Sequence, residues 1–447
     1  MLAAKPPERR VSALAQEPGT RELSRGALQT LVLRLGGGAL EFLLNLVVAR
    51  VCGAAGAGLF HSAITAANVA SVFARLGLDN TVLRRTAAHA AAGEEAALRG
   101  VVAGSARLAL ATSAVAALLL VVLAAWLARS VPSVREAGPL LQLAALGVLP
   151  LSLACLHGEA LKALRRVAAS QFVSAMLLPG VACVAALLLA PRFGAGGAVL
   201  AWVLGAFVAA GAGALCWRHA MRGSPPPVPV ASRELLAGSL ALLWVKTARL
   251  GTGWMATAAL LLWSSTADVG VYNVALRLSL ALGLLLMAVN SVAAPGFAAR
   301  VRLGDPAGLQ RLARRATVMA LVAGGPVALL LLVFPAAVMG LFGADFALAG
   351  PTVLQVLVLG QCINLLTGPV AYLLTMSGNE AALQHCMTVA VLAGGLCLLL
   401  LQREGALGAA IATTVAMVLQ NLGAAWCVWR RLGFVPTPLP LFRSATP

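Results

Sequence analysis

Hydrophobic and polar positions in this chain alternate on the scale of whole membrane spans. Long, mainly apolar runs recur from one end to the other, separated by short polar stretches. A helix needs about 20 such residues to cross a ~30 Å hydrocarbon core. The pattern predicts twelve transmembrane helices, at about 28–50, 58–78, 101–127, 138–158, 167–190, 195–217, 235–263, 269–295, 316–342, 350–375, 381–401 and 405–429.

The first six spans and the last six carry similar short sequences in the same order. Arg34-Leu35-Gly36-Gly37-Gly38 returns as Arg249-Leu250-Gly251-Thr252-Gly253, Gly58-Leu59-Phe60 as Gly270-Val271-Tyr272, Leu141-Gln142 with Gly147 as Leu354-Gln355 with Gly360, and Arg192-Phe193-Gly194-Ala195-Gly196-Gly197-Ala198 as Arg403-Glu404-Gly405-Ala406-Leu407-Gly408-Ala409. The spacing stays between 211 and 215 residues. Four ordered pairs at nearly one spacing predict two homologous halves.

The repeat and the polar stretches define the expected domain organisation. We expect an N-terminal tail at 1–27, a six-helix bundle at 28–217, a linker at 218–234, a second six-helix bundle at 235–431 and a C-terminal tail at 432–447. The linker contains Pro225-Pro226-Pro227, which is typical of a join between domains. The tail at 1–27 is polar, and the apolar span after it is too long for a signal peptide, so we predict a mobile cytoplasmic tail.

Composition supports a membrane protein. The chain is 60% hydrophobic and 11% charged, with a mean hydropathy of +0.92, whereas soluble domains carry about 25% charged residues. The net charge of +18 would suit nucleic acid, but the basic residues lie in short patches between spans. In alternate loops and both tails we count 23 Lys and Arg, against 5 in the other loops. This asymmetry predicts that both termini are cytoplasmic, and no nucleic-acid partner is expected.

The chain contains none of the common catalytic or metal-binding motifs. The eight cysteines and five histidines have no ligand spacing, and the cysteines are interpreted as small packing residues. The sequence contains no GxxxxGK[ST] phosphate loop, HExxH or GxSxG. We therefore expect no enzyme, no cofactor and no metal.

Charged residues inside the spans are the main candidates for a functional site. Five basic residues, Arg34, Arg75, Lys246, Arg249 and Arg277, lie within spans one, two, seven and eight. Glu41 shares the first span, and Asp79 lies where the second span ends. Each basic residue facing lipid at mid-membrane would cost roughly 2.5–3.5 kcal/mol, so Arg34 and Arg249 are expected to be buried, while Arg75 and Arg277 could snorkel.

Two interpretations of these charges remain open. In one, Glu41 and Asp79 neutralise neighbouring arginines and join helices together. In the other, the surplus of positive charge binds an anion, for which the planar guanidinium of arginine suits phosphate. The second predicts a hydrated cavity between the halves, with Arg34, Glu41, Arg75, Lys246, Arg249 and Arg277 as substrate-binding residues and Asn45, Asn68, Asn273 and Asn290 as lining residues. Gly36-Gly37-Gly38 is expected to allow close helix packing, or to act as a hinge.

The local sequences resemble a known superfamily. The run Gly56-Ala57-Gly58-Leu59-Phe60 opens the second span, and Leu76-Gly77-Leu78-Asp79-Asn80-Thr81-Val82-Leu83-Arg84-Arg85-Thr86-Ala87 follows it. With twelve spans in two halves, and Arg then Glu in the first span, the chain resembles the multidrug/oligosaccharidyl-lipid/polysaccharide (MOP) exporter superfamily. Over about residues 25–431 it is most similar to the polysaccharide flippases, which move lipid-linked oligosaccharides.

The resemblance implies an inner-membrane flippase for a polyprenyl-pyrophosphate-linked oligosaccharide, working by alternating access in surface-polysaccharide synthesis. It also implies glycan polymerase and other assembly proteins as partners, and maps the cavity cations of the family onto Arg34, Arg249, Lys246 and Arg277.

Several alternatives stay open. A lipid II flippase often has further C-terminal spans, and a cation-coupled multidrug antiporter needs intramembrane acids, for which only Glu41 and Asp79 qualify. A major facilitator needs a different loop after its second span, in which Gly precedes Asp by four residues. A non-transporting membrane scaffold needs no cationic cavity.

Overall fold

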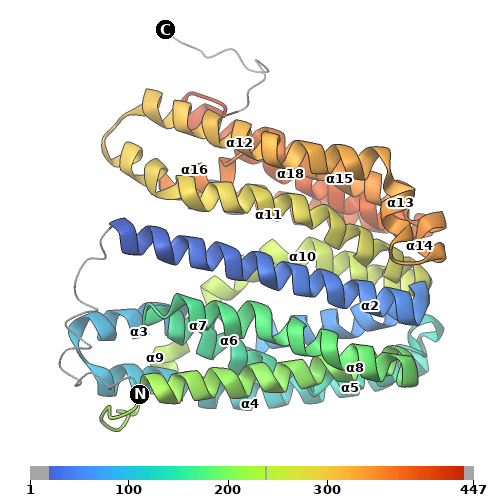
Figure 1. The fold of residues 1–447 in the computed structure, drawn as a ribbon, viewed down its shortest axis with the longest axis horizontal. Helices are drawn as coiled ribbons and strands as arrows, with labels where there is room; N and C mark the ends of the chain where they lie inside the picture. The colour runs from blue at the N-terminus through green and yellow to red at the C-terminus, as the bar shows by residue number, and fades with distance from the viewer. Residues whose placement is uncertain (1–19, 237–238, 437–447) are drawn as a thin grey trace. The chain divides into compact units, whose positions relative to one another are not determined.

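The computed structural model describes residues 20–236 and 239–436, and the side chains of 20–31 and of part of 240–302 lie outside the description. In the described ranges the regular elements are helices (Figure 1). Those of the first part are α2 (Thr20–Ala74), α3 (Leu78–Ala92), α4 (Glu95–Ser130), η1 (Pro132–Val134), α5 (Gly138–Ala145), α6 (Val148–Ala163), α7 (Val167–Gln171), η2 (Phe172–Leu177) and α8 (Leu178–Ala220). Those of the second are α9 (Ser232–Leu236), α10 (Ser239–Trp263), α11 (Thr266–Arg302), α12 (Pro306–Val333), α13 (Pro335–Gly340), α14 (Ala344–Ala349), α15 (Pro351–Thr367), α16 (Val370–Met376), α17 (Glu380–Leu400), η3 (Gln402–Glu404) and α18 (Gly405–Leu432).

The long apolar helices confirm a polytopic all-α membrane protein. Among the described residues seven helices are long and apolar enough to span a membrane, or up to nine when two bent pairs each count as one span. Two of the seven, Val32–Ala74 and Val167–Ala220, are long enough for two crossings each and are kinked at Gly53 and Gly194. Together with α10, of 25 residues, these elements account for the twelve predicted spans.

The kinks show the repeat in the backbone. Gly194 has φ 56° and ψ −139° inside α8, and Gly405 has φ 52° and ψ −131° at the start of α18. These two glycines occupy the same position in the repeated sequence. Residues with a side chain are strained in this region of backbone space, so glycine at both positions lets one span turn directly into the next.

The fourth span of each half is also bent at a short break. The angle is 42° between α5 and α6 and 45° between α15 and α16. The repeated glycines of these spans pack against the sixth span of their own half. A Cβ on Gly147 would lie 2.5 Å from the Trp202 ring, and one on Gly360 would lie 3.2 Å from Thr414. Small residues at these points let the helices approach closely.

Several predicted boundaries were wrong. The first two spans form one helical run whose kink is at Gly53, and α2 begins at Thr20, inside the predicted tail. The helix α3, which follows Gly77 with φ 77°, was not predicted. Its mixture of charged and small residues lacks the apolar run by which the spans were recognised. The ninth span ends at Val333 because Pro335 lacks an N–H and starts a new helix. Residues 1–19 and 437–447 of the predicted tails lie outside the described part of the chain.

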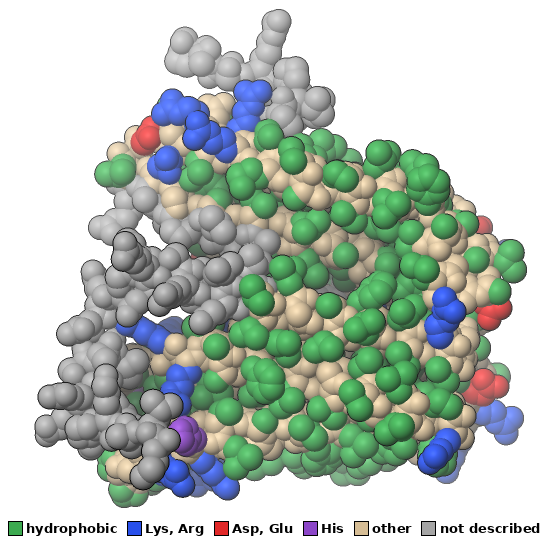
Figure 2. All heavy atoms as spheres, viewed as in Figure 1, with side chains coloured by type: hydrophobic (Ala, Val, Ile, Leu, Met, Phe, Trp, Pro, Cys, Tyr) green, Lys and Arg blue, Asp and Glu red, His purple; other side chains and the backbone are tan. Residues whose placement is uncertain are grey.

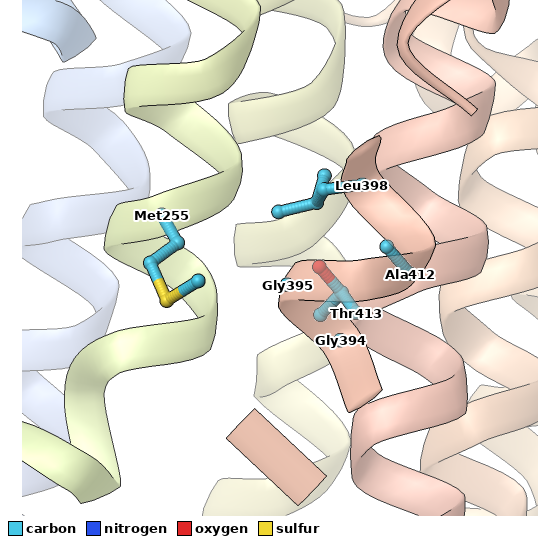
Figure 3. Close-up of a pocket in the computed structure, with 6 residues that line it drawn as sticks. All are labelled: Met255, Gly394, Gly395, Leu398, Ala412 and Thr413. Carbon is cyan, nitrogen blue, oxygen red and sulfur yellow. The ribbon is translucent and has the colours of Figure 1, made fainter. Parts of the chain in front are cut away.

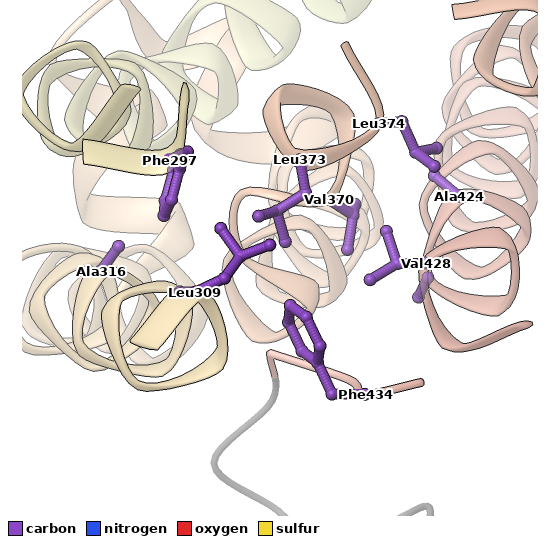
Figure 4. Close-up of a cluster of buried hydrophobic side chains, with 11 residues drawn as sticks. Phe297, Leu309, Ala316, Val370, Leu373, Leu374, Ala424, Val428 and Phe434 are labelled. Carbon is purple, nitrogen blue, oxygen red and sulfur yellow. The ribbon is translucent and has the colours of Figure 1, made fainter. Parts of the chain in front are cut away.

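The chain divides into two compact units. Unit 1 comprises Met1–Cys52 with Ser62–Thr247, and unit 2 comprises Gly53–His61 with Ala248–Pro447. In unit 1, Leu78 and Val82 of α3 pack with Val101 of α4, Leu156 of α6 and Leu235 of α9. In unit 2, Phe297, Leu309, Leu373, Val428 and Phe434 converge from α11, α12, α16, α18 and the segment after α18 (Figure 4).

The proline-rich linker packs against unit 1. Arg99 of α4 donates hydrogen bonds to the carbonyl oxygens of Ser224 (2.6 Å) and Pro225 (2.5 Å). Val228 donates its N–H to the carbonyl of Ala96 at 3.0 Å, and a Cβ on Gly100 would lie 1.9 Å from the carbonyl oxygen of Val228. The linker is thus held along α4 within unit 1, and its role as the join between two halves stays a prediction.

The molecular surface suits a lipid environment. Figure 2 shows Lys and Arg side chains gathered at the ends of the helices and hydrophobic side chains over the stretches between. Exposed large apolar residues include Leu118, Leu119, Val184, Leu188, Leu392 and Leu400. A soluble protein would place such residues in its core, whereas lipid tails accept them without cost.

Candidate functional site

The first candidate site is a polar strip on α2 in unit 1. Arg34 and Glu41 are both exposed, and their spacing of seven residues places both on one face of the helix. Glu41 lies within Val32–Ala74, a stretch of α2 that is long and apolar enough to span a membrane. The expected burial of Arg34 was wrong, because the apolar pattern of one helix does not say which face meets its neighbours.

The position of this strip is set by close packing against the start of the fifth span. A Cβ on Gly37 would lie 2.5 Å from the carbonyl oxygen of Ala175, and one on Gly36 would lie 3.2 Å from Met176. Ala175 and Met176 belong to η2, a stretch of π-helix, a rare form often found at functional sites. The Nε of Arg34 donates to Oε1 of Gln171 at 3.3 Å, just before that stretch. The glycine run therefore serves packing, and α2 bends at Gly53 instead.

Arg75 is held by residues of unit 1. Its side chain is 4% exposed, and its Nε lies 2.9 Å from the carboxylate of Asp79. It also donates to the Ser71 hydroxyl, which lies 3.0 Å from that of Ser152 on α6. Arg75 therefore does not snorkel, and its contacts with Asp79 and Ser71 give it a role in joining α2, α3 and α6. This supports the first interpretation of the intramembrane charges for this residue.

The second candidate site lies in unit 2, where the segment Gly53–His61 of α2 meets α11. A Cβ on Gly58 would lie 1.7 Å from the carbonyl oxygen of Thr266, and one on Gly270 would lie 2.0 Å from that of Ala54. The two helices therefore touch backbone to backbone at the two repeat-related glycines. Arg277, which is half-buried, lies two turns beyond Gly270 and interacts electrostatically with His61. Sequence analysis did not single out His61, because a lone histidine in a span gives no spacing signal.

The four asparagines have different surroundings. Asn273 is buried, donates to the carbonyl of Val269 at 2.9 Å and accepts from the Thr257 hydroxyl at 3.4 Å. Asn45 and Asn290 are buried, and Oδ1 of each has no hydrogen-bond partner among the described residues. Asn68 is half-buried. Asn273 thus bonds a neighbouring helix, and the lining role of all four stays a prediction.

Lys246 and Arg249 both lie in α10, but their side chains are outside the described part of the chain. Their predicted convergence on a substrate therefore remains a prediction.

A small gap lies in unit 2 between α10, α17 and α18 (Figure 3). Its lining is Met255, Gly394, Gly395, Leu398, Ala412 and Thr413, and its empty volume is about 170 Å³. This volume includes open solvent, and the gap leaves no room for a water molecule. The Thr413 hydroxyl is already bonded to that of Tyr272 at 2.8 Å. The gap is too small and too apolar for a charged substrate.

Two cysteines that are distant in the sequence approach each other in unit 2. The Sγ atoms of Cys386 on α17 and Cys427 on α18 are 3.8 Å apart. Since a disulfide has an S–S length of about 2.05 Å, these are two thiols in contact, as expected for packing residues. In the described residues no three His, Cys, Asp or Glu side chains come together in a metal-binding group.

Solved structures with the same fold define the class of this protein. The chain is similar to the lipid II flippase MurJ in an inward closed conformation (TM-score 0.72, 12% identity, covering 90% of this chain and 87% of that one). It is also similar to a multidrug resistance MATE family transporter of the MOP superfamily in an inward-facing conformation (TM-score 0.71, 15% identity, 90% and 98%). A MOP superfamily transporter from Pyrococcus furiosus gives a TM-score of 0.64 at 15% identity, with 94% and 98% covered. The fold is therefore that of the MOP superfamily transporters.

Within this class the family is also identified. The family described as "Polysaccharide biosynthesis protein" matches residues 47–348, and the chain belongs to it. Comparison with curated proteins found no match.

Proposed function

We propose that this protein is a flippase that moves a polyprenyl-pyrophosphate-linked oligosaccharide across the bacterial inner membrane for surface-polysaccharide synthesis. Membership of the polysaccharide biosynthesis family and the MOP transporter fold support a transporter of this kind. The observation that carries the proposal is the exposure of Arg34 and Glu41 on the membrane-embedded part of α2. A charged side chain facing lipid at that depth is costly, so this strip is expected to face water and a polar guest.

The charges suit the headgroup of such a substrate. The pyrophosphate would accept paired hydrogen bonds from the Arg34 guanidinium, and from Arg277, Lys246 and Arg249 as the substrate moves. Glu41 would keep Arg34 oriented or accept hydrogen bonds from sugar hydroxyls. The polyprenyl chain would remain in lipid against the apolar surface. Arg75 is left out of this set, since its ion pair with Asp79 already balances its charge.

Transport would follow alternating access, in which a site at mid-membrane opens first to one side and then to the other. The proposed setting is a multi-pass protein with both termini in the cytoplasm, working beside a glycan polymerase and other assembly proteins.

The proposal is tested by Arg34 variants reconstituted in liposomes with a fluorescent lipid-linked oligosaccharide. Flipping is measured as the fraction of probe protected from a membrane-impermeant quencher. A hydrogen bond to a charged group contributes about 1.5–3 kcal/mol, so Arg34→Ala should slow flipping roughly 10- to 100-fold. Arg34→Lys should retain part of the rate, because it keeps the charge and loses the paired geometry.

Arg192→Ala is the matched control, because Arg192 is exposed at the end of a span, outside the proposed site. It should flip the probe at the wild-type rate. Wild-type flipping by a stably inserted Arg34→Ala/Arg277→Ala protein would reject the proposal.

A second candidate function is cation-coupled antiport of small molecules, favoured by the exposed intramembrane Glu41. In the same liposomes, this function would give ethidium transport that follows an imposed cation gradient and is lost in Glu41→Gln, with no flipping of the lipid-linked probe. A lipid II flippase would instead flip lipid II and leave other lipid-linked glycans behind.

A further inference from the structure

His61 is a fully buried histidine whose ring is not satisfied. Its side chain is 0% exposed, and neither Nδ1 nor Nε2 has a hydrogen-bond partner in the described part of the chain. The Phe60 ring contacts it edge-on at 5.3 Å between centroids. Buried polar groups are nearly always hydrogen-bonded, so an orphaned imidazole inside a membrane span indicates a function that this state of the protein does not show.

The helix crossing directs His61 toward Arg277. His61 lies one turn past Gly58 on α2, and Arg277 lies two turns past Gly270 on α11, so each is on the face of its helix that carries the contact glycine. Because Gly58 and Gly270 have no side chains, the two backbones come together at the crossing. Arg277 is consequently close enough to act electrostatically on His61.

The second repeat shows a hydrogen-bonded residue at the equivalent position. Asn273 follows Gly270-Val271-Tyr272 as His61 follows Gly58-Leu59-Phe60. The Asn273 amide is hydrogen-bonded through both of its polar atoms, to Val269 and Thr257. The ring of His61 makes no equivalent bond among the described residues. This difference between the two repeats indicates that His61 does more than join helices.

The charged groups around His61 are few. On α2 itself no Lys, Arg, Asp or Glu occurs between Arg50 and Arg75. On α11, Asp268 is held by the hydroxyls of Ser264 (2.5 Å) and Ser265 (2.8 Å) at the start of the helix. Arg300 and Arg302 lie at its far end, and Arg277 is the charged residue of that helix that acts on the ring. The side chains of Lys246 and Arg249 on α10 lie outside the described residues.

We propose that His61 and Arg277 form an intramembrane anion site in which binding of the anion is linked to uptake of a proton by the imidazole. A second positive charge on a buried ring beside a guanidinium is unfavourable, so the ring without an anion is expected to stay neutral. An anion at Arg277 supplies the opposite charge, and the protonated ring can then donate a hydrogen bond that the neutral ring lacks. By linkage, the anion favours the proton as much as the proton favours the anion.

The chemistry of the site requires an oxyanion or a similar small anion. The identity of the natural ligand rests on the proposed function. If that function holds, the ligand is the pyrophosphate of the lipid-linked substrate. A free inorganic anion has the same chemistry, and the two sources are separated by experiment. Sulfate is the probe for the site itself, since its charge does not change between about pH 5 and 8.

The test is a histidine NMR titration of the full-length protein in detergent micelles. The chain has five histidines, so the signal of His61 is assigned as the one missing from His61→Asn, which carries the residue of the second repeat. At about pH 6, adding sodium sulfate should move the His61 signal from the neutral to the charged position. Sodium gluconate at equal ionic strength should move it far less, and in Arg277→Gln sulfate should leave it neutral.

Three results would overturn the proposal: a His61 signal that ignores sulfate, one that is charged without any anion, and a sulfate response that survives in Arg277→Gln. Melting temperatures within a few degrees of wild type show that the variants are folded. A second arm replaces sulfate with the lipid-linked oligosaccharide, and a response to sulfate alone assigns the site to a free anion. Because the flipping assay on Arg34 variants does not depend on His61, failure of this inference is distinguishable from failure of the proposed function.

Discussion

Arginines in the membrane-embedded helices of this protein differ in what surrounds them. Arg75 is buried beside the Asp79 carboxylate and donates to the Ser71 hydroxyl, whereas Arg34 is exposed on α2 and reaches Gln171 through its Nε. A buried ion pair with its hydrogen bonds complete has little left to offer a ligand. An exposed guanidinium, with five N–H groups in a planar fork, is accessible to a phosphate.

Removing one partner of the buried pair is predicted to harm stability more than removing both. Arg75→Met leaves the Asp79 carboxylate buried without its cation, which should destabilise the protein by about 3–5 kcal/mol, whereas Arg75→Met/Asp79→Leu should recover most of that loss. The measurement is unfolding in detergent micelles, followed by circular dichroism. The double variant should also flip the substrate. A folded double variant that does not flip the substrate would show that Arg75 takes part in transport.

The sequence alone indicated which predicted spans carry the charged residues. It did not distinguish the ion-paired Arg75 from the exposed Arg34. Arg75 and Asp79 are four residues apart across a turn at Leu76 and Gly77, both with positive φ. The ion pair forms across that turn, and the Ser71 hydroxyl to which Arg75 donates contacts Ser152, a residue 77 positions away in the chain from Arg75. Long-range packing of this kind leaves no periodic signal in the sequence.

At the scale of helices, glycine decides where two backbones can touch. Gly58 and Gly270 lie at the crossing of α2 and α11, and carbonyl oxygens of the opposite helix occupy the space that a Cβ would need. The sequence predicted both residues as equivalent members of a repeat. It did not indicate that the two glycines would meet, because a repeat shows which residues are equivalent and does not show which residues are in contact.

Gly58→Ala and Gly270→Ala are each predicted to force α2 and α11 apart. The added methyl group meets backbone, which cannot rotate away, so the loss should be at least the roughly 1–3 kcal/mol of an overpacked core. Gly325→Ala in α12 is the matched control, since nothing lies within 4 Å of that position. It should stabilise the protein by up to about 1 kcal/mol through helix propensity. Thermal unfolding of the three variants in one detergent compares them directly, and equal effects at Gly58 and Gly325 would contradict the close crossing.

At the scale of the whole chain, an even number of spans requires the two ends of the chain to lie on the same side of the membrane. The basic residues of the tails and alternate loops favour the cytoplasm for that side. The linker held against α4 by Arg99 is expected on the same side.

This topology is tested by single cysteines in a cysteine-free background. Cysteines in place of Arg192 and Arg403, at the repeated turns, should react with a membrane-impermeant maleimide in intact cells. One in place of Gly223 in the linker should react only after permeabilisation. Labelling in the opposite order would reverse the predicted orientation, and labelling at Arg192 and Arg403 from different sides would contradict the repeat.

The sequence by itself determined the class of fold, the approximate positions of the spans and the repeated segments, because the hydrophobic effect acts on whole runs of residues and glycine and proline mark where those runs turn. It also determined which spans carry charge. The tertiary structure decided that Arg75 is paired, that Arg34 is exposed, that the Gly36 run packs on a π-helix and that His61 lies buried near Arg277. Those outcomes depend on which faces of distant helices come together, and the energies involved arise only when the packed neighbours supply, or withhold, a hydrogen bond or an opposite charge.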